Sequence, residues 1–222
     1  MWTSLIPLIL GSALVPIEIV ITIMLLGSPS RVRAAGAWVG GMVAARLAQG
    51  VVFGMILHWG ERVQSDRTHG WFVSSVLLVV AILFFVLAAR EFVSDDDPDA
   101  PPPKWMKMLS SVTPVKAFLI GVGVIAVALK FWVFTLGAIG VIGAADLGRA
   151  ANLVTYLLFV LLVVSPHLVI VGVALIMPGR SKALLNPTLR WLQDNNRVIM
   201  IVLGLVFGTW FLSKALSGMG VL

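Results

Sequence analysis

The chain contains no cysteine among its 222 residues, which excludes a disulfide framework, a CxxC redox pair and thiolate metal sites. Charge is also scarce, because Asp, Glu, Lys and Arg together make up only 12% of the residues, about half of what soluble domains carry. Hydrophobic residues make up 59%, and the mean hydropathy is +1.04. This composition predicts an integral membrane protein.

Catalytic signatures are missing as well: there is no HExxH, no GxSxG and no phosphate-cradling glycine loop. The three histidines are His58, His69 and His167, and no two of them have metal-ligand spacing. The net charge of +6 forms no basic patch that alternates with aromatic residues. We therefore expect no enzymatic activity, no cofactor, no metal ion and no nucleic-acid partner.

The chain contains several long apolar stretches. A bilayer core about 30 Å thick needs roughly 20 apolar residues in a helix. The stretches that qualify cover residues 3–26, 34–58, 71–92, 115–142, 150–177 and 197–217. The sequence thus predicts an all-α membrane protein with six transmembrane helices, of which the fourth and fifth are long enough to tilt, kink or break.

The basic residues outside these stretches or near their ends are distributed unevenly. Most of them follow the first, third and fifth stretches, whereas the other side has four: Arg62, Arg67, Arg149 and Lys214. Lys and Arg concentrate in cytoplasmic loops. We therefore expect a multi-pass protein of the bacterial inner (cytoplasmic) membrane with both termini outside.

A linker over residues 94–113, rich in acidic residues and proline, separates two halves of a single transmembrane domain, 1–93 and 114–222. Such a composition buries little apolar area and predicts a mobile cytoplasmic connector. Three stretches on each side place the halves in opposite orientations, as an inverted repeat requires. A second cytoplasmic segment carries apolar residues around Trp191, and we expect a short interfacial helix after Pro187.

Three ionisable residues lie near the middle of apolar stretches: Glu18, Arg46 and Lys130. A charge at the centre of a bilayer helix costs roughly 2.5–3.5 kcal/mol, and such residues usually face the bundle interior and serve a function. Two bases and one acid leave about one excess positive charge. This pattern favours a site for an anionic group inside a transporter, with Lys130 as the anion contact. The alternative is a permanent structural ion pair between Glu18 and Arg46.

Pro16 interrupts the first stretch, because it has no N–H to donate and leaves the carbonyl of Ser12 free. Glu18 follows two residues later and shares a helical face with Thr22. A carboxylate beside an opened turn predicts a site that binds a proton or orients a ligand. A simple proline kink is the other interpretation.

Two further places complete the candidate site. Gln49 lies one turn along the helix from Arg46, whose planar guanidinium can hold a carboxylate or phosphate in two-point contact. In the fifth stretch Pro166 frees the carbonyl of Leu162, and His167 beside it can titrate near neutral pH. A packing role for His167 is the alternative.

The segment SALVPIEIVITIMLLGSPSRVRAAGAWVGG resembles the opening of proteins of the lysine-exporter (LysE) superfamily, in particular its GAP family of mycobacterial peptidoglycolipid-addressing proteins. KAFLIGVG at the start of the fourth stretch and Trp191-Leu192 to Asn195-Asn196 before the last extend the similarity over most of the chain. Where those proteins have an Asn-Pro-Lys-Asn-like turn, this chain has Ala128-Leu129-Lys130-Phe131. The resemblance implies an inner-membrane exporter fold linked to envelope glycolipids. The missing asparagine and proline leave open whether the fourth stretch contains a second broken helix.

Together these observations lead to one hypothesis and one alternative. The hypothesis is an exporter of a small or lipid-linked anionic substrate, in which Glu18 binds a coupling proton while Arg46 and Lys130 hold the anion. The alternative is a membrane partner that transports nothing and stabilises an envelope-biosynthesis complex, with the acidic linker and the Trp191 segment as docking surfaces. Membrane lipids are expected partners in both cases, and glycine-rich helix faces permit a homodimer.

Overall fold

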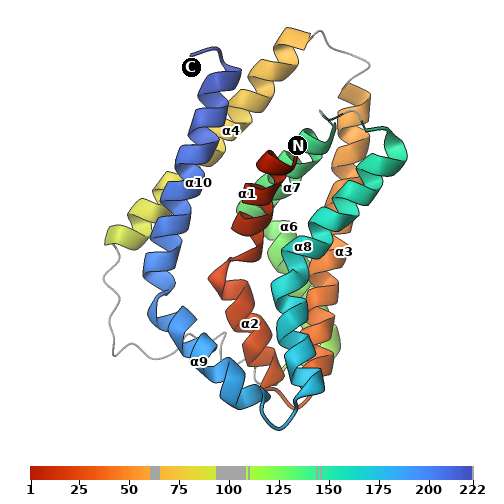
Figure 1. Ribbon diagram of the computed structural model, residues 1–222, viewed down its shortest axis with the longest axis vertical. Coiled ribbons are helices and arrows are strands. Elements are labelled where there is room, and N and C mark those ends of the chain that lie inside the picture. Colours follow the sequence, from red (N-terminus) through yellow and green to blue (C-terminus); the bar gives the residue numbers. More distant parts are fainter. Residues whose placement is uncertain (61–65, 94–108, 110, 144, 146, 222) are drawn as a thin grey trace. The chain divides into compact units, whose positions relative to one another are not determined.

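The computed structural model describes the chain except for residues 61–65, 94–108, 110, 144, 146 and 222. All regular secondary structure in the described ranges is helical (Figure 1). The helices are α1 (Trp2–Ala13), α2 (Pro16–Leu26), α3 (Arg31–Gly60), α4 (Asp66–Val93), α6 (Pro114–Val127), α7 (Leu129–Gly143), α8 (Arg149–Ile176), α9 (Ser181–Asp194) and α10 (Asn196–Gly218). They form two compact units, Met1–Gly54 with Pro101–Gln193 and Met55–Ala100 with Asp194–Leu222.

Three of the described helices are long and apolar enough to cross a membrane: Arg31–Gly54, Arg149–Ile176 and Asn196–Gly218. The count rises to five if each of two bent helix pairs, α1 with α2 and α6 with α7, is one span. This result confirms the all-α class within the described residues, and the apolar helices are consistent with a multi-pass membrane protein. The count of six spans and the inverted halves stay predictions, as do the boundaries of the linker, most of which lies outside the described residues.

The first bent pair breaks at Leu14 and Val15, where α1 and α2 meet at 48°. Pro16 is the first residue of α2, a position at which its missing N–H costs nothing. The residue before a proline avoids helical backbone angles, and Val15 is extended with φ −68° and ψ 111°. Pro16 therefore ends one helix and starts another, which is a sharper interruption than a kink.

The second bent pair breaks at Ala128, and its two arms meet at 69°. Ala128 is extended, with φ −79° and ψ 108°, although no proline follows it. The break leaves carbonyls at the end of α6 without helical partners, and two side chains bond to them. Nε2 of Gln49 donates to the carbonyl of Ile125 over 3.2 Å, and Nε1 of Trp132 donates to that of Ala126 over 2.8 Å.

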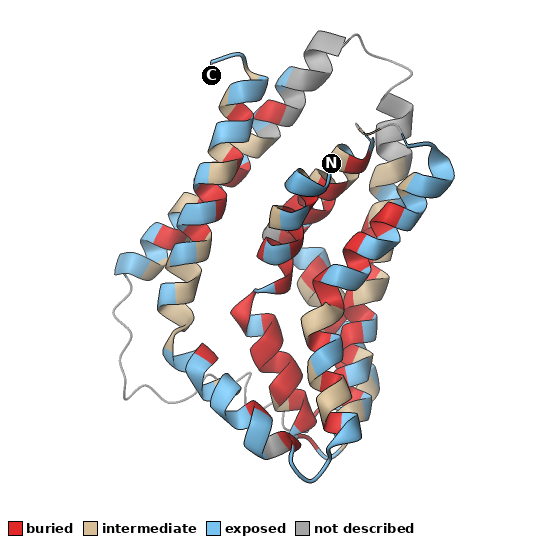
Figure 2. Cartoon of the chain, viewed as in Figure 1, coloured by how far each residue is buried: buried red, intermediate tan, exposed pale blue. Residues whose placement is uncertain are grey.

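Within the first unit, α1 packs against α7 and α8, and α2 packs against α8. Figure 2 shows that α2 is buried on almost all sides. Glycines allow α3 and α6 to approach closely, because a Cβ on Gly41 would meet the backbone of Phe118, and one on Gly121 would meet that of Trp38. Helix α2 thus lies in the interior of this unit, next to α3 and α8, and these helices carry the candidate site.

The exposed surface of α8 is apolar. Its exposed large side chains are Leu153, Val154, Leu157, Leu158, Leu161, Leu162, Leu168, Val169, Leu175 and Ile176. Its buried side includes Thr155, Tyr156 and His167. This arrangement, with apolar groups outside and polar groups inside, suits a helix in contact with lipid.

The second unit is built on an antiparallel pair, α4 and α10 (Figure 1). At one end Nε of Arg197 donates to the carbonyl of Glu91 over 3.0 Å, and its Nη2 donates to that of Phe92 over 2.7 Å. At the other end Gly218 lies against the side chain of Ser74. Arg197 therefore caps the carbonyls at the C-terminal end of α4.

The expected interfacial helix begins earlier than the sequence suggested. It was placed after Pro187, but α9 starts at Ser181 and includes Pro187. Proline leaves the carbonyl four residues back, at Ala183, without a helical partner. Ala183 is exposed, so solvent or lipid headgroups can satisfy this carbonyl, and the helix continues.

Candidate functional site

The carboxylate of Glu18 lies in the first turn of α2, the helix that begins at Pro16. Its side chain is fully buried, with an exposed fraction of 0%. The N-terminus of a helix carries a partial positive charge, which stabilises an acid placed in its first turn. The helix break therefore places a carboxylate inside the first unit, and the N-terminus of α2 compensates part of its negative charge.

Arg46 faces Glu18 from α3, where it continues the buried side that also carries Trp38 and Met42. Its Nη2 lies 4.0 Å from Oε1 of Glu18, and its exposed fraction is also 0%. The guanidinium carbon lies 5.4 Å from the centre of the Phe131 ring. The predicted pairing of Glu18 with Arg46 is thus present, but the atoms are too far apart for a hydrogen bond.

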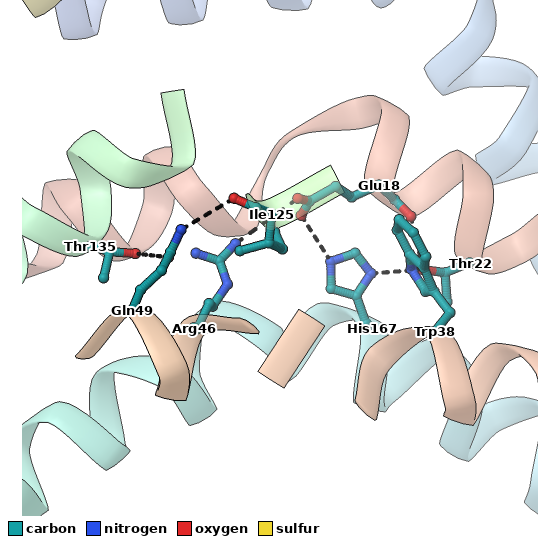
Figure 3. Close-up of polar contacts among 8 residues, drawn as sticks. All are labelled: Glu18, Thr22, Trp38, Arg46, Gln49, Ile125, Thr135 and His167. Atoms are coloured by element: carbon teal, nitrogen blue, oxygen red, sulfur yellow. Dashed lines mark hydrogen bonds and ion pairs between the residues drawn. The ribbon is translucent and has the colours of Figure 1, made fainter. Parts of the chain in front are cut away.

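His167 approaches the same carboxylate from α8 (Figure 3). Its Nε2 lies 3.5 Å from Oε2 of Glu18, and its exposed fraction is 0%. The other ring nitrogen, Nδ1, lies 2.9 Å from Oγ1 of Thr22. Glu18 therefore lies between a guanidinium and an imidazole that come from two different helices.

The hydroxyl of Thr22 connects three groups. It donates to the carbonyl of Glu18 over 2.8 Å, accepts from Nε1 of Trp38 over 3.1 Å and contacts His167. Thr22, Trp38 and His167 are each 0% exposed. This network fixes the orientation of the imidazole relative to Glu18 (Figure 3).

Gln49 lies on the other side of Arg46 and serves the second helix break. Besides its bond to Ile125 on α6, it accepts a hydrogen bond from Oγ1 of Thr135 on α7 over 3.1 Å. It therefore joins the two arms of the bent pair. Sequence reasoning placed Gln49 in the binding site, and the contacts show it as a bridge across the break next to Arg46.

Tyr156 forms a hydrogen bond with the backbone of Arg46. Its hydroxyl donates to the carbonyl of Arg46 over 2.6 Å. The ring lies against Gly50, where a Cβ would collide with it. Gly50 thus permits the close approach of α8 to α3 at the level of the site.

Several polar atoms in this interior make no hydrogen bond within the described residues. They are both carboxylate oxygens of Glu18, all three guanidinium nitrogens of Arg46, Nε2 of His167 and Oγ of Ser12. Buried polar groups in proteins are almost always hydrogen-bonded, so each of these atoms calls for a partner. The guanidinium of Arg46 has five N–H groups, which can donate to the oxygens of an anionic acceptor.

Of the other predicted residues, Pro16 and Ser12 are buried at the first break, whereas Lys130 lies on α7 with its side chain outside the described residues. Pro166 lies inside α8, and Oγ of Ser165 donates to the carbonyl of Leu162 that the proline frees. That carbonyl is therefore satisfied locally and is not offered to a ligand.

Sequence reasoning did not assign Trp38, Thr135 or Tyr156 to the site. Trp38 precedes Arg46 by eight residues, which places the two on one face of a helix, so its position could have been found from spacing. Thr135 and Tyr156 come from helices whose packing the sequence does not reveal. Within the described residues no group of three or more His, Asp or Glu side chains could hold a metal ion.

Neither the search of curated proteins nor the search of solved structures gave a match. A family model does match residues 5–217, which is nearly the whole chain. It describes a lipid-addressing family related to the peptidoglycolipid-addressing proteins that the sequence resembles, while membership of the lysine-exporter superfamily stays a prediction. The chain belongs to the Sap, sulfolipid-1-addressing protein, family.

Proposed function

We propose that this protein is an inner-membrane exporter of an anionic, lipid-linked substrate, and that Arg46 binds the anionic headgroup. The family name refers to a sulfolipid. The sulfur-containing acidic groups of sulfated lipids are strong acids, so they keep a negative charge at all physiological pH values. The observation that carries the proposal is the fully buried guanidinium of Arg46, whose nitrogens make no hydrogen bond within the described residues. Its planar fork matches the oxygens of a sulfate or carboxylate.

The two broken helices support a transport role. In transporters built from repeats, interrupted helices at corresponding positions of the two halves surround the substrate site. Here the first predicted span of each half is interrupted, at Val15 and at Ala128. Glu18 follows the first break, and Gln49 next to Arg46 bridges the second. We propose that the halves are inverted repeats and that the breaks flank the substrate.

The distribution of basic residues supports an orientation with both termini outside and the headgroup entering from the cytoplasm. Export of an anion is also favoured by a membrane potential that is negative inside, by about 2.3 kcal/mol per charge and 100 mV. Lys130 remains the proposed second cationic contact. We propose no chemical step, so the protein would move its substrate unchanged.

Lipid movement in proteoliposomes tests the proposal. The probes are a fluorescent short-chain sulfated glycolipid and its unsulfated counterpart, and dithionite quenching reports which leaflet each occupies. We expect the protein to move the sulfated probe faster than the neutral one. Arg46→Gln removes a charge-assisted contact worth about 1.5–3 kcal/mol, which corresponds to roughly a 10- to 150-fold loss.

The matched control is Arg149→Gln, which removes an exposed arginine from the start of α8 and should leave the rate unchanged. Equal movement of both probes, or an Arg46→Gln rate equal to that of Arg149→Gln, would contradict the proposal. If the protein moves the sulfated probe between leaflets and this movement requires the guanidinium of Arg46, the protein is a transporter.

The alternative role is a membrane partner that transports nothing. In that role the Glu18–Arg46–His167 cluster would be a structural element of the interior and would bind no substrate. Deletion of residues 94–103 separates the two roles. A transporter should keep its activity without this segment, whereas a partner that docks through it should lose its complex. Loss of lipid export in cells with normal movement in proteoliposomes would favour the partner role.

A further inference from the structure

We propose that the site binds the anionic headgroup together with one proton, which is held between Oε2 of Glu18 and Nε2 of His167. The inference rests on the proposed function, because it concerns the same site. Two independent observations carry it: the pattern of donors and acceptors around Thr22, and the balance of charge around Arg46 (Figure 3).

The hydroxyl of Thr22 has one hydrogen and three neighbours. The indole of Trp38 can only donate to it, and the carbonyl of Glu18 can only accept from it. When the hydroxyl donates to that carbonyl, it has no hydrogen left for Nδ1 of His167 at 2.9 Å. Nδ1 must then carry a hydrogen and donate it to Thr22.

This assignment determines what faces Glu18. A neutral imidazole with its hydrogen on Nδ1 has a bare lone pair on Nε2. That lone pair points toward Oε2 of Glu18 at 3.5 Å, and two acceptors would repel each other in a buried site. One additional proton between Nε2 and Oε2 turns this repulsion into a hydrogen bond, whichever of the two atoms carries it.

A second arrangement needs no additional proton. If the hydroxyl of Thr22 turns its hydrogen to Nδ1, the hydrogen of the imidazole lies on Nε2 and is donated to the carboxylate of Glu18. The two arrangements thus differ by one proton and by the rotation of one hydroxyl. The network can take up or release a proton without any movement of a helix.

Charge balance links this proton to the anion. The ionisable residues in the interior of the helices around the site are Glu18, Arg46, His167 and Tyr156, with the side chain of Lys130 outside the described residues. α1 carries none, and Lys116 of α6 is exposed. Tyr156 donates its hydroxyl hydrogen to the carbonyl of Arg46 and adds no charge. Without the proton, Glu18 and Arg46 balance each other.

A headgroup bound to Arg46 disturbs this balance. The anion and Glu18 would both face one guanidinium, which leaves one negative charge uncompensated inside the unit. Burial of an uncompensated charge is unfavourable, and groups in such a position take up a proton. Since a bound proton on the Glu18–His167 pair restores neutrality, binding of the anion and binding of the proton should favour each other.

Calorimetry on the full-length protein in nanodiscs tests this linkage. The probe is a short-chain sulfated galactosyl lipid, which does not itself titrate between pH 5 and 9. Titrations in two buffers of different ionisation enthalpy give the number of protons taken up on binding. We expect about one proton per lipid, and an affinity that falls with rising pH by up to about tenfold per pH unit.

Glu18→Gln should bind the probe without proton uptake and with an affinity independent of pH, because an amide does not titrate. The matched control Glu91→Gln, on α4 in the other unit, should keep the uptake. The measurement on the unaltered protein decides the matter even if Glu18→Gln does not fold.

Binding of the probe without proton uptake would overturn the inference and leave the proposed function intact, as expected if Lys130 supplies the balancing charge. Uptake that persists in Glu18→Gln would also overturn it. No binding of the probe at any pH would overturn both the inference and the proposed function.

Discussion

The indole nitrogen of Trp38 on α3 donates to the hydroxyl of Thr22 on α2 over 3.1 Å, and both side chains are completely buried. This bond joins the helix that carries Arg46 to the helix that carries Glu18. It also completes the set of partners through which Thr22 orients His167. The geometry of the charged cluster therefore depends on one hydroxyl group.

Removal of that hydroxyl should destabilise the protein. Thr22→Val leaves the donor of Trp38 and a ring nitrogen of His167 buried without partners, at a cost of about 1–3 kcal/mol in the free energy of unfolding. Thr22→Ser keeps the hydroxyl and should unfold close to the parent protein. Thermal unfolding in micelles compares the two variants, and equal melting temperatures would show that the network contributes nothing to stability.

Gln49 should control the stability of the break at Ala128. Gln49→Leu removes the bonds to Ile125 and Thr135, so the two arms of the bent pair lose their bridge. We expect faster hydrogen exchange in peptides that cover residues 125–135. Gln193→Leu changes an exposed glutamine on α9 and is the matched control. If both variants exchange alike, Gln49 does not hold the break.

The crossing of α3 and α6 should tolerate no side chain at Gly41. A Cβ there would collide with the backbone of Phe118, which cannot yield as a flexible side chain does. Gly41→Ala should cost about 1–3 kcal/mol, as overpacking usually does. Gly36→Ala on the same helix meets nothing within 4 Å and should be neutral or stabilising by up to about 1 kcal/mol. Equal melting temperatures would contradict this packing.

The pairing of α4 with α10 should weaken without Arg197. Arg197→Met removes two bonds to the carbonyls of Glu91 and Phe92, and we expect faster hydrogen exchange over residues 88–93. Arg190→Met on α9 removes an exposed arginine and controls for the lost charge. An unchanged exchange rate in Arg197→Met would show that the cap is dispensable.

The helices were predictable because hydrophobicity and length define them. Each of the six apolar stretches corresponds to a helix or a bent helix pair within a few residues. Pro16 also predicted the first break, since proline restricts the backbone angles of the residue before it. Ala128 gave no such signal: its extended backbone is accompanied by side-chain bonds from Gln49 and Trp132, which sequence alone does not reveal.

The same limit applies to the candidate site. Charges within apolar stretches identified Glu18 and Arg46, because intramembrane charges are rarely incidental. A packing role was the alternative for His167, and the structure places its Nε2 3.5 Å from Oε2 of Glu18. The sequence could not show this contact, since it depends on how α8 packs against α2. The sequence also does not show which glycines of α3 lie at close helix contacts: Gly50 lies against Tyr156, whereas Gly36 and Gly54 face open space.

The most direct test of the central claim is native mass spectrometry of the lipids that stay bound to the purified protein. The unaltered protein and Arg149→Gln should retain an anionic lipid or glycolipid, and Arg46→Gln should retain little of it while neutral lipids remain. If Arg46→Gln retains the same anionic lipids as the other two, the buried guanidinium is not a headgroup site and the charged cluster is structural.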